Sequence, residues 1–202
     1  MNGEKDLIKQ RKVIVGLGNP GEEYENTRHN TGFMYIDFLL EKDLKGDGFQ
    51  AKKLKHSVVY SIREDLLLVK PQTFMNKSGI AVREVVKWLD VDIEKELILV
   101  HDDLDIPFGK YKFQFAKSPK DHKGVKSVED HLGTTRFYRL RIGVDNRQGK
   151  IINTSTRSVR LISPSKTVRS GEKYVLERFK KEELIEIKGV FGEISIESLL
   201  SG

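Results

Sequence analysis

The sequence predicts an α/β fold in which helices cover both faces of one sheet. Short apolar runs rich in β-branched residues, such as Lys12–Leu17, alternate along the chain with segments whose apolar residues recur at helical spacing. This alternation of strands and helices is typical of the α/β class. The chain has 202 residues, of which 38% are hydrophobic and 33% are charged, which is enough to bury one substantial core. We therefore expect residues 1–202 to form a single domain.

Strands are expected where apolar runs end at glycine, proline or charged residues. They cover residues 12–17, 57–63, 66–70, 97–100, 110–115 and 137–144, and the second and third should form a hairpin. Helices are expected where apolar residues fall on one face. The first runs from about Asn30 to the polar stretch at residues 46–48. The others cover residues 78–90, 125–132, 173–179 and 182–188.

Cysteine is absent from the sequence. Disulfide bonds, thiolate metal sites and cysteine nucleophiles are therefore excluded. The N-terminal segment lacks the apolar region of a signal peptide, and no later run approaches the length needed to span a membrane. We expect a cytoplasmic protein without a membrane partner.

The net charge of +6 and a pI near 9.3 indicate a polyanionic partner such as a nucleic acid. This charge is unevenly distributed, because the chain carries basic residues and no acidic residue between Arg147 and Gly171. We treat this stretch, about residues 146–171, as a basic insertion. It is either a solvated loop or a segment that contacts RNA.

Gly16, Gly18 and Gly21 follow the first strand at the spacing of a dinucleotide-binding loop. Such a loop requires a helix that begins inside it and directs its N-terminus at the pyrophosphate. Here Pro20 and a polar run continue for about another turn or two, and no acidic residue closes a second strand at the expected distance. Dinucleotide binding is the weaker interpretation, and we expect no cofactor.

The segment His101–Asp105 (HDDLD) places an imidazole close to several carboxylates, as a divalent-metal site can. Successive residues of a strand point to opposite faces, so His101 and Asp102 cannot easily ligate one ion. The acidic residues also suit a turn before Pro107. We expect no metal ion here.

Polar side chains are expected at the carboxyl ends of two strands, where open α/β sheets place their ligands. Asn19 follows the first strand, Asp102 ends a later one, and His29 lies where a loop becomes a helix. An aspartate facing a histidine is the orienting group and base of many hydrolases. The chain has no G-x-S-x-G motif, so water is the expected nucleophile. The side-chain amides of Asn19 and Asn76 are candidates to stabilise an oxyanion.

Four longer segments occur in the order VGLGNPGEEYENTRHNTGF (Val15–Phe33), KPQTFMNKSG (Lys70–Gly79), HDDLDIPFG (His101–Gly109) and HLGTTRFYRLRIGV (His131–Val144), followed by YVLERFKKEE (Tyr174–Glu183). Together they resemble the bacterial-type peptidyl-tRNA hydrolase family. The resemblance implies a single α/β domain whose mixed, mostly parallel twisted sheet lies between helices. It also implies hydrolysis of the ester bond of peptidyl-tRNA, which releases a peptide and free tRNA.

The resemblance implies roles for particular residues of this chain. His29 matches the catalytic histidine, and Asp102 matches the acid that orients it. Asn19 and Asn76 match asparagines that hold the peptide and the attacked carbonyl, and we count Asn19 among the catalytic residues. Tyr24 and Asn30 are expected to line the cleft for the tRNA 3′ end, and Phe74 and Met75 are expected to form its apolar wall. Asn76, His122 and Lys123 are expected to contact the substrate beside this wall. Arg141 is expected to contact a tRNA phosphate.

The chain departs from the family pattern beside this cleft. In AKSPKDHKG (Ala116–Gly124) His122 is kept, but Lys123 replaces an asparagine that helps to position substrate and water. Gln114 also stands where a basic residue is usual. Lys123 and the basic insertion leave a second interpretation open, a non-catalytic RNA-binding relative similar to plastid splicing factors. The retained asparagines, histidine and aspartate favour a hydrolase, which we expect to act as a monomer.

Overall fold

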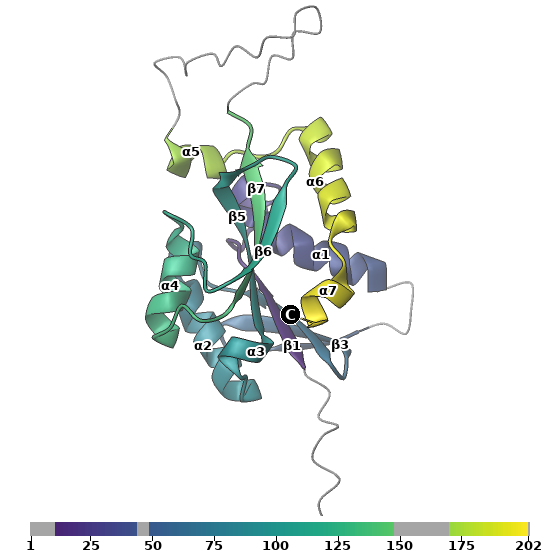
Figure 1. Cartoon of the computed structure of the whole chain (residues 1–202), viewed down its shortest axis with the longest axis vertical. Coiled ribbons are helices and arrows are strands. Elements are labelled where there is room, and N and C mark those ends of the chain that lie inside the picture. Colours follow the sequence, from purple (N-terminus) through teal and green to yellow (C-terminus); the bar gives the residue numbers. More distant parts are fainter. Residues whose placement is uncertain (1–10, 44–48, 148–169, 202) are drawn as a thin grey trace, which may run out of the picture.

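The computed structural model describes residues 11–43, 49–147 and 170–201. Within them, seven strands form one sheet in the order β2-β3-β4-β1-β5-β7-β6 (Figure 1). The strands are β1 (Lys12–Gly16), β2 (Gln50–Lys53), β3 (Ser57–Arg63), β4 (Leu66–Pro71), β5 (Leu97–Pro107), β6 (Tyr111–Phe115) and β7 (Tyr138–Asp145). The central strands β4, β1, β5 and β7 pair in parallel, and the outer strands pair antiparallel. The predicted α/β class with a mixed sheet is confirmed.

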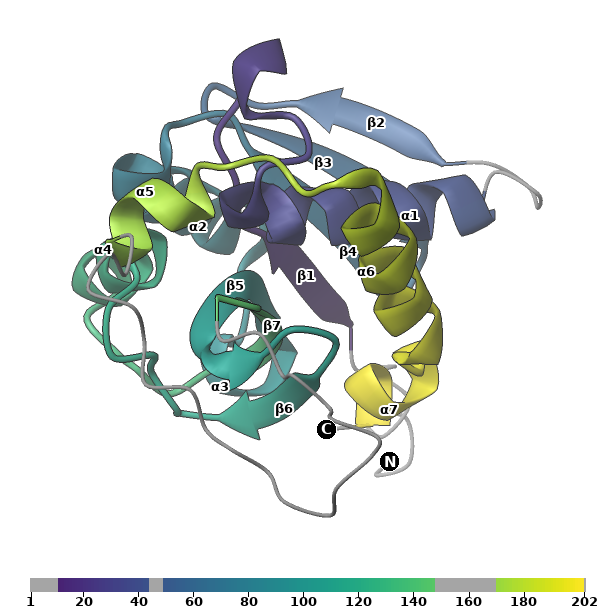
Figure 2. The same ribbon diagram turned by 90° about the horizontal axis from the view of Figure 1, so that it is seen from above.

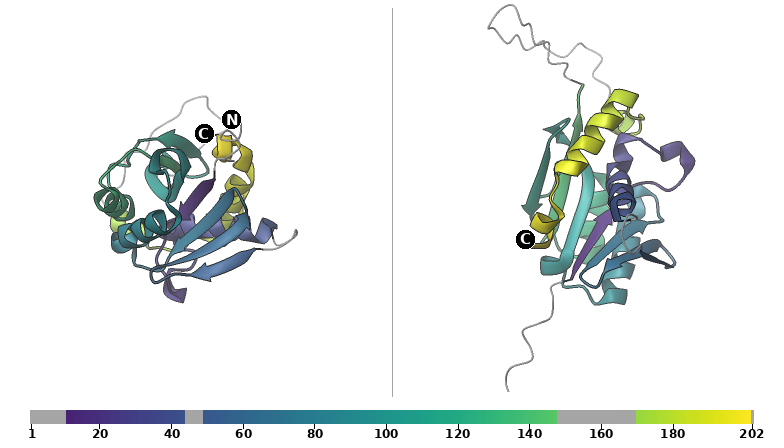
Figure 3. Two further views of the ribbon diagram at one scale, coloured as in Figure 1. Left: turned by 90° about the horizontal axis from the view of Figure 1, so that it is seen from below. Right: turned by 90° about the vertical axis from the view of Figure 1, so that its right-hand side faces the viewer.

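Helices cover both faces of this sheet. They are α1 (Thr31–Asp43), α2 (Ser78–Leu89), α3 (Ile93–Glu96), α4 (Lys123–Leu132), α5 (Gly171–Val175), α6 (Lys181–Glu193) and α7 (Ile196–Ser201), with 3-10 turns η1 (Glu22–Tyr24), η2 (Arg28–Asn30) and η3 (Met75–Lys77). Helices α2 and α4 lie on one face, and α1, α6 and α7 lie on the other, as the left-hand view in Figure 3 shows.

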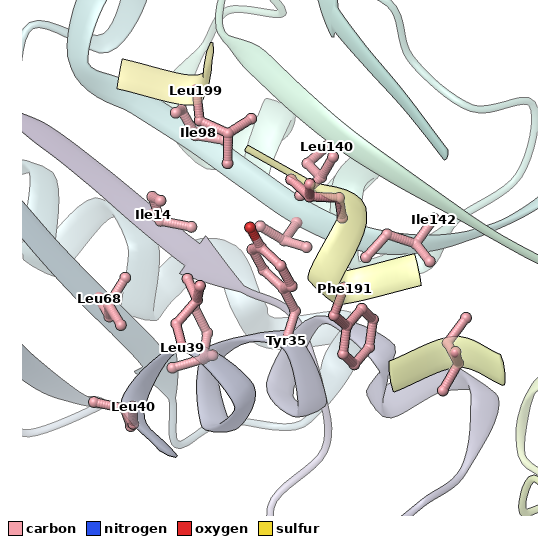
Figure 4. Close-up of a cluster of buried hydrophobic side chains, with 14 of the residues drawn as sticks. Ile14, Tyr35, Leu39, Leu40, Leu68, Ile98, Leu140, Ile142, Phe191 and Leu199 are labelled. Atoms are coloured by element: carbon pink, nitrogen blue, oxygen red, sulfur yellow. The ribbon is translucent and has the colours of Figure 1, made fainter. Parts of the chain in front are cut away.

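The alternation of side chains along β1 explains these two layers. Ile14 belongs to the core between the sheet and α1 and α6, together with Tyr35 and Ile98 (Figure 4). Val13 and Val15 belong to the core beneath α2 and α4. Because residues i and i+2 of a strand share a face, a strand covered on both sides needs apolar residues at every position. The continuous apolar run in β1 meets that requirement.

Two glycines allow α1 to lie directly on β1. A Cβ added to Gly16 would lie 2.3 Å from the carbonyl oxygen of Gly32, and a Cβ added to Gly32 would lie 2.4 Å from the backbone nitrogen of Leu17. The ring of Phe33 covers Gly18 in the same way, 2.5 Å from the position of an added Cβ. Gly16 and Gly18 therefore make room for α1, which explains a spacing that resembles a dinucleotide-binding loop.

Strand β5 continues beyond its expected end. The sequence predicts a strand that ends at His101 and Asp102, but β5 stays in register with β7 through Asp103 and, after a register shift, reaches Pro107. His101 and Asp102 thus lie inside a central strand. Their backbone is fixed by the sheet rather than by a loop.

The helix expected over residues 173–179 is shorter and begins earlier, because α5 ends at Val175. Beyond it the chain turns to meet the loop before α1. The guanidinium of Arg28 donates to the carbonyl oxygens of Glu177 and Arg178 at 3.2 and 3.1 Å. These tertiary hydrogen bonds replace the helical ones that the local pattern predicts.

The basic insertion lies almost wholly outside the described residues. The structure describes only its two ends, at residues 146–147 and 170–171. The extent of the domain over this stretch and its contact with RNA stay predictions. In the part of the chain that is described, no helix is long and apolar enough to cross a membrane.

The close approach of α1 to β1 leads to a stability prediction. A methyl group at Gly32 would meet backbone atoms of Leu17 and Val100 within 2.4 to 2.5 Å, and backbone atoms cannot rotate away. We expect Gly32→Ala to lower the free energy of unfolding by about 1–3 kcal/mol, measured by urea denaturation. Gly189→Ala in α6 is the control, because an added Cβ there meets nothing within 4 Å. It should raise stability by about 0.5–1 kcal/mol, and equal stabilities for the two variants would contradict the packing account.

Candidate functional site

A cleft of about 970 Å³ lies beyond the carboxyl end of β1. Its walls come from η2, η3, β5, the start of α4 and α5, which are far apart in the sequence. Figure 2 looks onto α5 from above, and α5 contacts η2. Residues of α5 thus line the cleft.

His29 and Asp102 meet in this cleft although 73 positions separate them in the sequence. The Nδ1 atom of His29 lies 3.0 Å from Oδ1 and 3.2 Å from Oδ2 of Asp102. An ionised carboxylate only accepts hydrogen bonds, so Nδ1 carries the hydrogen. In the neutral ring, Nε2 of His29 is then the nitrogen with a free lone pair.

The charges around this pair set its protonation. Burial acts to lower the pKa of His29, but the negative charge and hydrogen bond of Asp102 outweigh burial and the nearby charge of Lys123, so this pKa lies above its usual value of 6.5. For Asp102, burial acts to raise the pKa, but its two histidine neighbours lower it well below the usual range. Asp102 therefore stays ionised at neutral pH.

His122 is the second histidine bound to this carboxylate. Its Nε2 atom lies 2.9 Å from Oδ1 of Asp102, the same oxygen that His29 contacts. On the neighbouring position of β5, burial lowers the pKa of His101 to about 3, so that ring is neutral. The carboxylate of Asp102 thus contacts two of these three rings, those of His29 and His122.

The side-chain amide of Asn19 is oriented by backbone groups. Its Oδ1 accepts a hydrogen bond from the backbone N–H of Met75 at 2.7 Å. The side chain of Asn30 accepts from the backbone nitrogen of Asn19 at 2.8 Å and donates to its carbonyl oxygen at 2.9 Å. Within the described residues Nδ2 of Asn19 has no hydrogen-bond partner, and Asn19 lines the cleft. An amide donor held in this way suits a developing negative oxygen.

Apolar side chains form much of the cleft wall. The rings of Tyr24 and Phe74 meet edge to face with centroids 6.2 Å apart, and Phe74 remains 53% exposed. Met75 is buried in the same wall, Val175 contributes from α5, and Leu176 follows directly after that helix. Neither Val175 nor Leu176 is among the site residues expected from the sequence.

Lys123 and Glu172 form an ion pair at the rim of the cleft. The Nζ atom of Lys123, at the start of α4, lies 2.7 Å from Oε1 of Glu172 in the first turn of α5. Both side chains are mostly exposed, so the pair contributes little to stability. The lysine that replaces the family's asparagine is thus already engaged by a carboxylate. Asn76 is exposed and lines the same cleft.

The structure places two of the expected contact residues elsewhere. Asn30 is buried against the backbone of Asn19 and lines a neighbouring pocket of about 410 Å³ instead of the cleft. Arg141 is also buried, and its guanidinium donates to Asp103 at 2.8 Å and Gln114 at 2.9 Å. The geometry therefore argues against a phosphate contact by Arg141, because its guanidinium is buried and already paired with a carboxylate.

Arg28 is a residue that the sequence analysis missed. It is buried and donates to both carboxylate oxygens of Glu183 at 3.0 and 2.9 Å. Its guanidinium also lies over the rings of Tyr174 and Phe179, 4.4 and 5.0 Å from their centroids. These contacts hold the turn that carries His29 against α5 and α6. No local pattern signals them, because every partner lies more than a hundred positions away.

The ligand atoms of His29, Asp102 and His122 lie within 4.8 Å of one another, which raises the question of a metal ion. Both imidazole nitrogens lie 2.9 to 3.0 Å from one carboxylate oxygen, as hydrogen-bond donors do. A metal would need both nitrogens without hydrogens, at about 2.0–2.1 Å from the ion. This donor set fits a hydrogen-bonded group better than a metal centre.

Comparisons with known proteins agree with the fold and show the family of the chain. The family model described as peptidyl-tRNA hydrolase matches residues 13–199. A peptidyl-tRNA hydrolase of Pediococcus pentosaceus is 39% identical over 88% of this chain and 85% of its own length, and one of Mycoplasma mycoides is 44% identical over 70% and 77%. The crystal structure of the peptidyl-tRNA hydrolase from Acinetobacter baumannii superposes with a TM-score of 0.70 at 26% identity, covering 91% of this chain and 84% of that one. The chain therefore belongs to the peptidyl-tRNA hydrolase family.

Proposed function

We propose that this chain hydrolyses the ester bond between a peptide and the 3′ end of tRNA. The main support is the hydrogen bond from Nδ1 of His29 to Asp102, which leaves the basic Nε2 for a water molecule in the cleft. The relatives are named peptidyl-tRNA hydrolases, which indicates the substrate. The direct test is release of free tRNA from N-acetylated aminoacyl-tRNA by the full chain.

In the proposed mechanism Nε2 of His29 takes a proton from water as the water oxygen attacks the ester carbonyl. The charge on the carbonyl oxygen is stabilised by amide donors, for which Nδ2 of Asn19 is the best-oriented candidate. Asp102 stabilises the imidazolium that forms. The tetrahedral intermediate then expels the 3′ oxygen of tRNA, which receives the proton back from His29, so that a free acid and an intact tRNA result.

The walls of the cleft suit the 3′ end of an RNA. Unpaired bases stack on aromatic side chains, and the exposed Phe74 and the half-buried Tyr24 offer such rings. Leu176 adds an exposed apolar surface. We propose that the protein acts as a monomer. Because the substrate is a product of translation, we place the reaction in the cytoplasm.

A non-catalytic RNA-binding function is the second candidate, and Lys123 is the observation that favours it. A lysine only donates hydrogen bonds, whereas the asparagine it replaces both donates and accepts. If water requires that acceptor, hydrolysis is lost while RNA binding remains. Binding of peptidyl-tRNA without release of tRNA would decide for this alternative.

The first prediction concerns the proposed base. Replacing His29 by alanine should lower the single-turnover rate of tRNA release by about 100- to 10,000-fold, with fold and tRNA affinity retained. His56→Ala is a matched control, because His56 contacts Glu84 on the surface and lies outside the cleft. A rate for His29→Ala equal to that of the control would refute the assignment.

The second prediction concerns pH. Because Asp102 raises the pKa of His29, cleavage should fall as the pH drops through a value above 6.5. The charge of Lys123 acts to lower this pKa, so Lys123→Asn should move the acid limb of the rate profile to higher pH. Lys126→Asn is the control, because Lys126 pairs with Asp130 on the same helix and does not line the cleft. A shift of the acid limb to lower pH would contradict the electrostatic account.

The third prediction concerns the ion pair at the rim. Above the acid limb, Lys123→Asn should raise the single-turnover cleavage rate and weaken tRNA binding, most clearly at low salt. Glu172→Gln should have the opposite effect on binding, because it frees the ammonium of Lys123 for a phosphate. Titration of labelled tRNA at low and high salt measures both. Lower cleavage by Lys123→Asn, or parallel changes in affinity for the two variants, would argue against this role.

A further inference from the structure

His122 uses both nitrogens of its ring. It precedes α4, and its Nδ1 accepts from the backbone N–H groups of Gly124 and Val125 at 3.2 Å each. Its Nε2 lies 2.9 Å from Oδ1 of Asp102. A nitrogen that accepts from two N–H groups carries no hydrogen, so the hydrogen of the neutral ring is on Nε2. His122 is therefore fixed as a donor to Asp102 and has no free lone pair for water.

We infer that His122 is a positioning residue, which ties the carboxylate of Asp102 to the N-terminus of α4 and thereby sets the direction in which Asp102 faces His29. The inference rests on the proposed function and refines the expectation that His122 contacts the substrate. Asp102 could otherwise rotate about its last side-chain bond. Two donors, from η2 and from the start of α4, fix the orientation of its oxygens.

The first turn of α4 is itself held in place. A Cβ added to Gly124 would lie 2.3 Å from the sulfur of Met75, so this turn packs closely on the cleft wall. The backbone N–H of Met75 holds the amide of Asn19. One turn of helix thus connects the carboxylate that orients the proposed base with the amide proposed to stabilise the oxyanion.

Several charged or titratable groups surround this arrangement, and each bears on a pH readout. His29 faces Asp102 from η2, His122 faces it from the start of α4, and His101 donates through Nδ1 to its carbonyl oxygen at 2.7 Å. Lys123 acts on His29 from the rim. Without the donor at His122, the carboxylate of Asp102 interacts more strongly with His29 and raises the pKa of His29 further. The acid limb of the cleavage rate should therefore move to higher pH.

Two substitutions separate the two contacts of His122. Asparagine caps helices well but is too short to reach Asp102, so His122→Asn should keep stability and lower the cleavage rate roughly 10- to 100-fold, the range typical of a lost orienting partner. Glutamine is a poor cap, but its amide nitrogen lies at about the distance of Nε2. His122→Gln should lower the melting temperature, lose less of the rate than His122→Asn, and retain the acid limb near its original pH.

The matched control is Asp92→Ala, because Asp92 caps α3 by accepting from Glu94 and Lys95 and lies outside the cleft. It should lower the melting temperature and leave the rate and its acid limb unchanged. If His122 serves only as a cap, the order of the two cleavage rates reverses. His122→Gln then cleaves more slowly, His122→Asn cleaves at the normal rate, and the inference is overturned.

Ring ¹⁵N spectra of His29 provide a readout that does not depend on turnover. The proton on Nδ1 should be well defined in the unmodified chain and in His122→Gln, and should exchange faster in His122→Asn. Unchanged spectra in His122→Asn would overturn the positioning role even if the unmodified chain cleaves peptidyl-tRNA. Absence of tRNA release by the unmodified chain would instead overturn the proposed function, and the spectra would still decide the role of His122.

Discussion

The buried carboxylate of Asp102 is the constraint on which the rest of the site depends. A charge that is removed from water needs partners, and an unpaired one would cost several kcal/mol or change its protonation. Asp102 lies in a central strand whose backbone cannot move, so the partners must come to it. His29 arrives from η2 and His122 from the start of α4. The position of one acidic side chain therefore decides where two separate segments meet the sheet.

The fold supports this meeting by contacts that are not part of the cleft. Gly16 and Gly32 allow α1 to lie on β1. Because η2 directly precedes α1, this packing also fixes the distance between η2 and the sheet. Arg28 then holds η2 against α5 and α6 through Glu183 and two aromatic rings. Because α5 is also a wall of the cleft, Arg28 links the orientation of His29 to the shape of the site.

Much of the fold could be predicted from the sequence, where the spacing of apolar residues within one element reflects the burial of that element. The apolar run of β1 and the helical spacing of α2 reflect burial, and both elements lie close to their expected bounds. The short elements β2, α3 and α7 were missed. Strand β2 (QAKK) is exposed throughout and depends on pairing with β3, and α3 has only four residues. Such elements are stabilised by tertiary contacts more than by their own sequence.

The same contrast between local patterns and tertiary contacts holds for the site. The motifs indicated His29, Asp102 and Asn19, and these three line one cleft. They could not reveal that Arg141 is paired with Asp103 or that Lys123 meets Glu172, because each pairing joins distant segments. The wall formed by Val175 and Leu176 was missed for the same reason.

The most direct test of the account is the titration of His29, followed by ring ¹⁵N chemical shifts and compared with the pH dependence of tRNA release. The account expects the neutral ring to carry its hydrogen on Nδ1, a pKa above 6.5, and an acid limb of cleavage at that same pKa. A hydrogen on Nε2, or cleavage that persists at full rate after His29 has become protonated, would contradict the claim that Asp102 prepares His29 as the base.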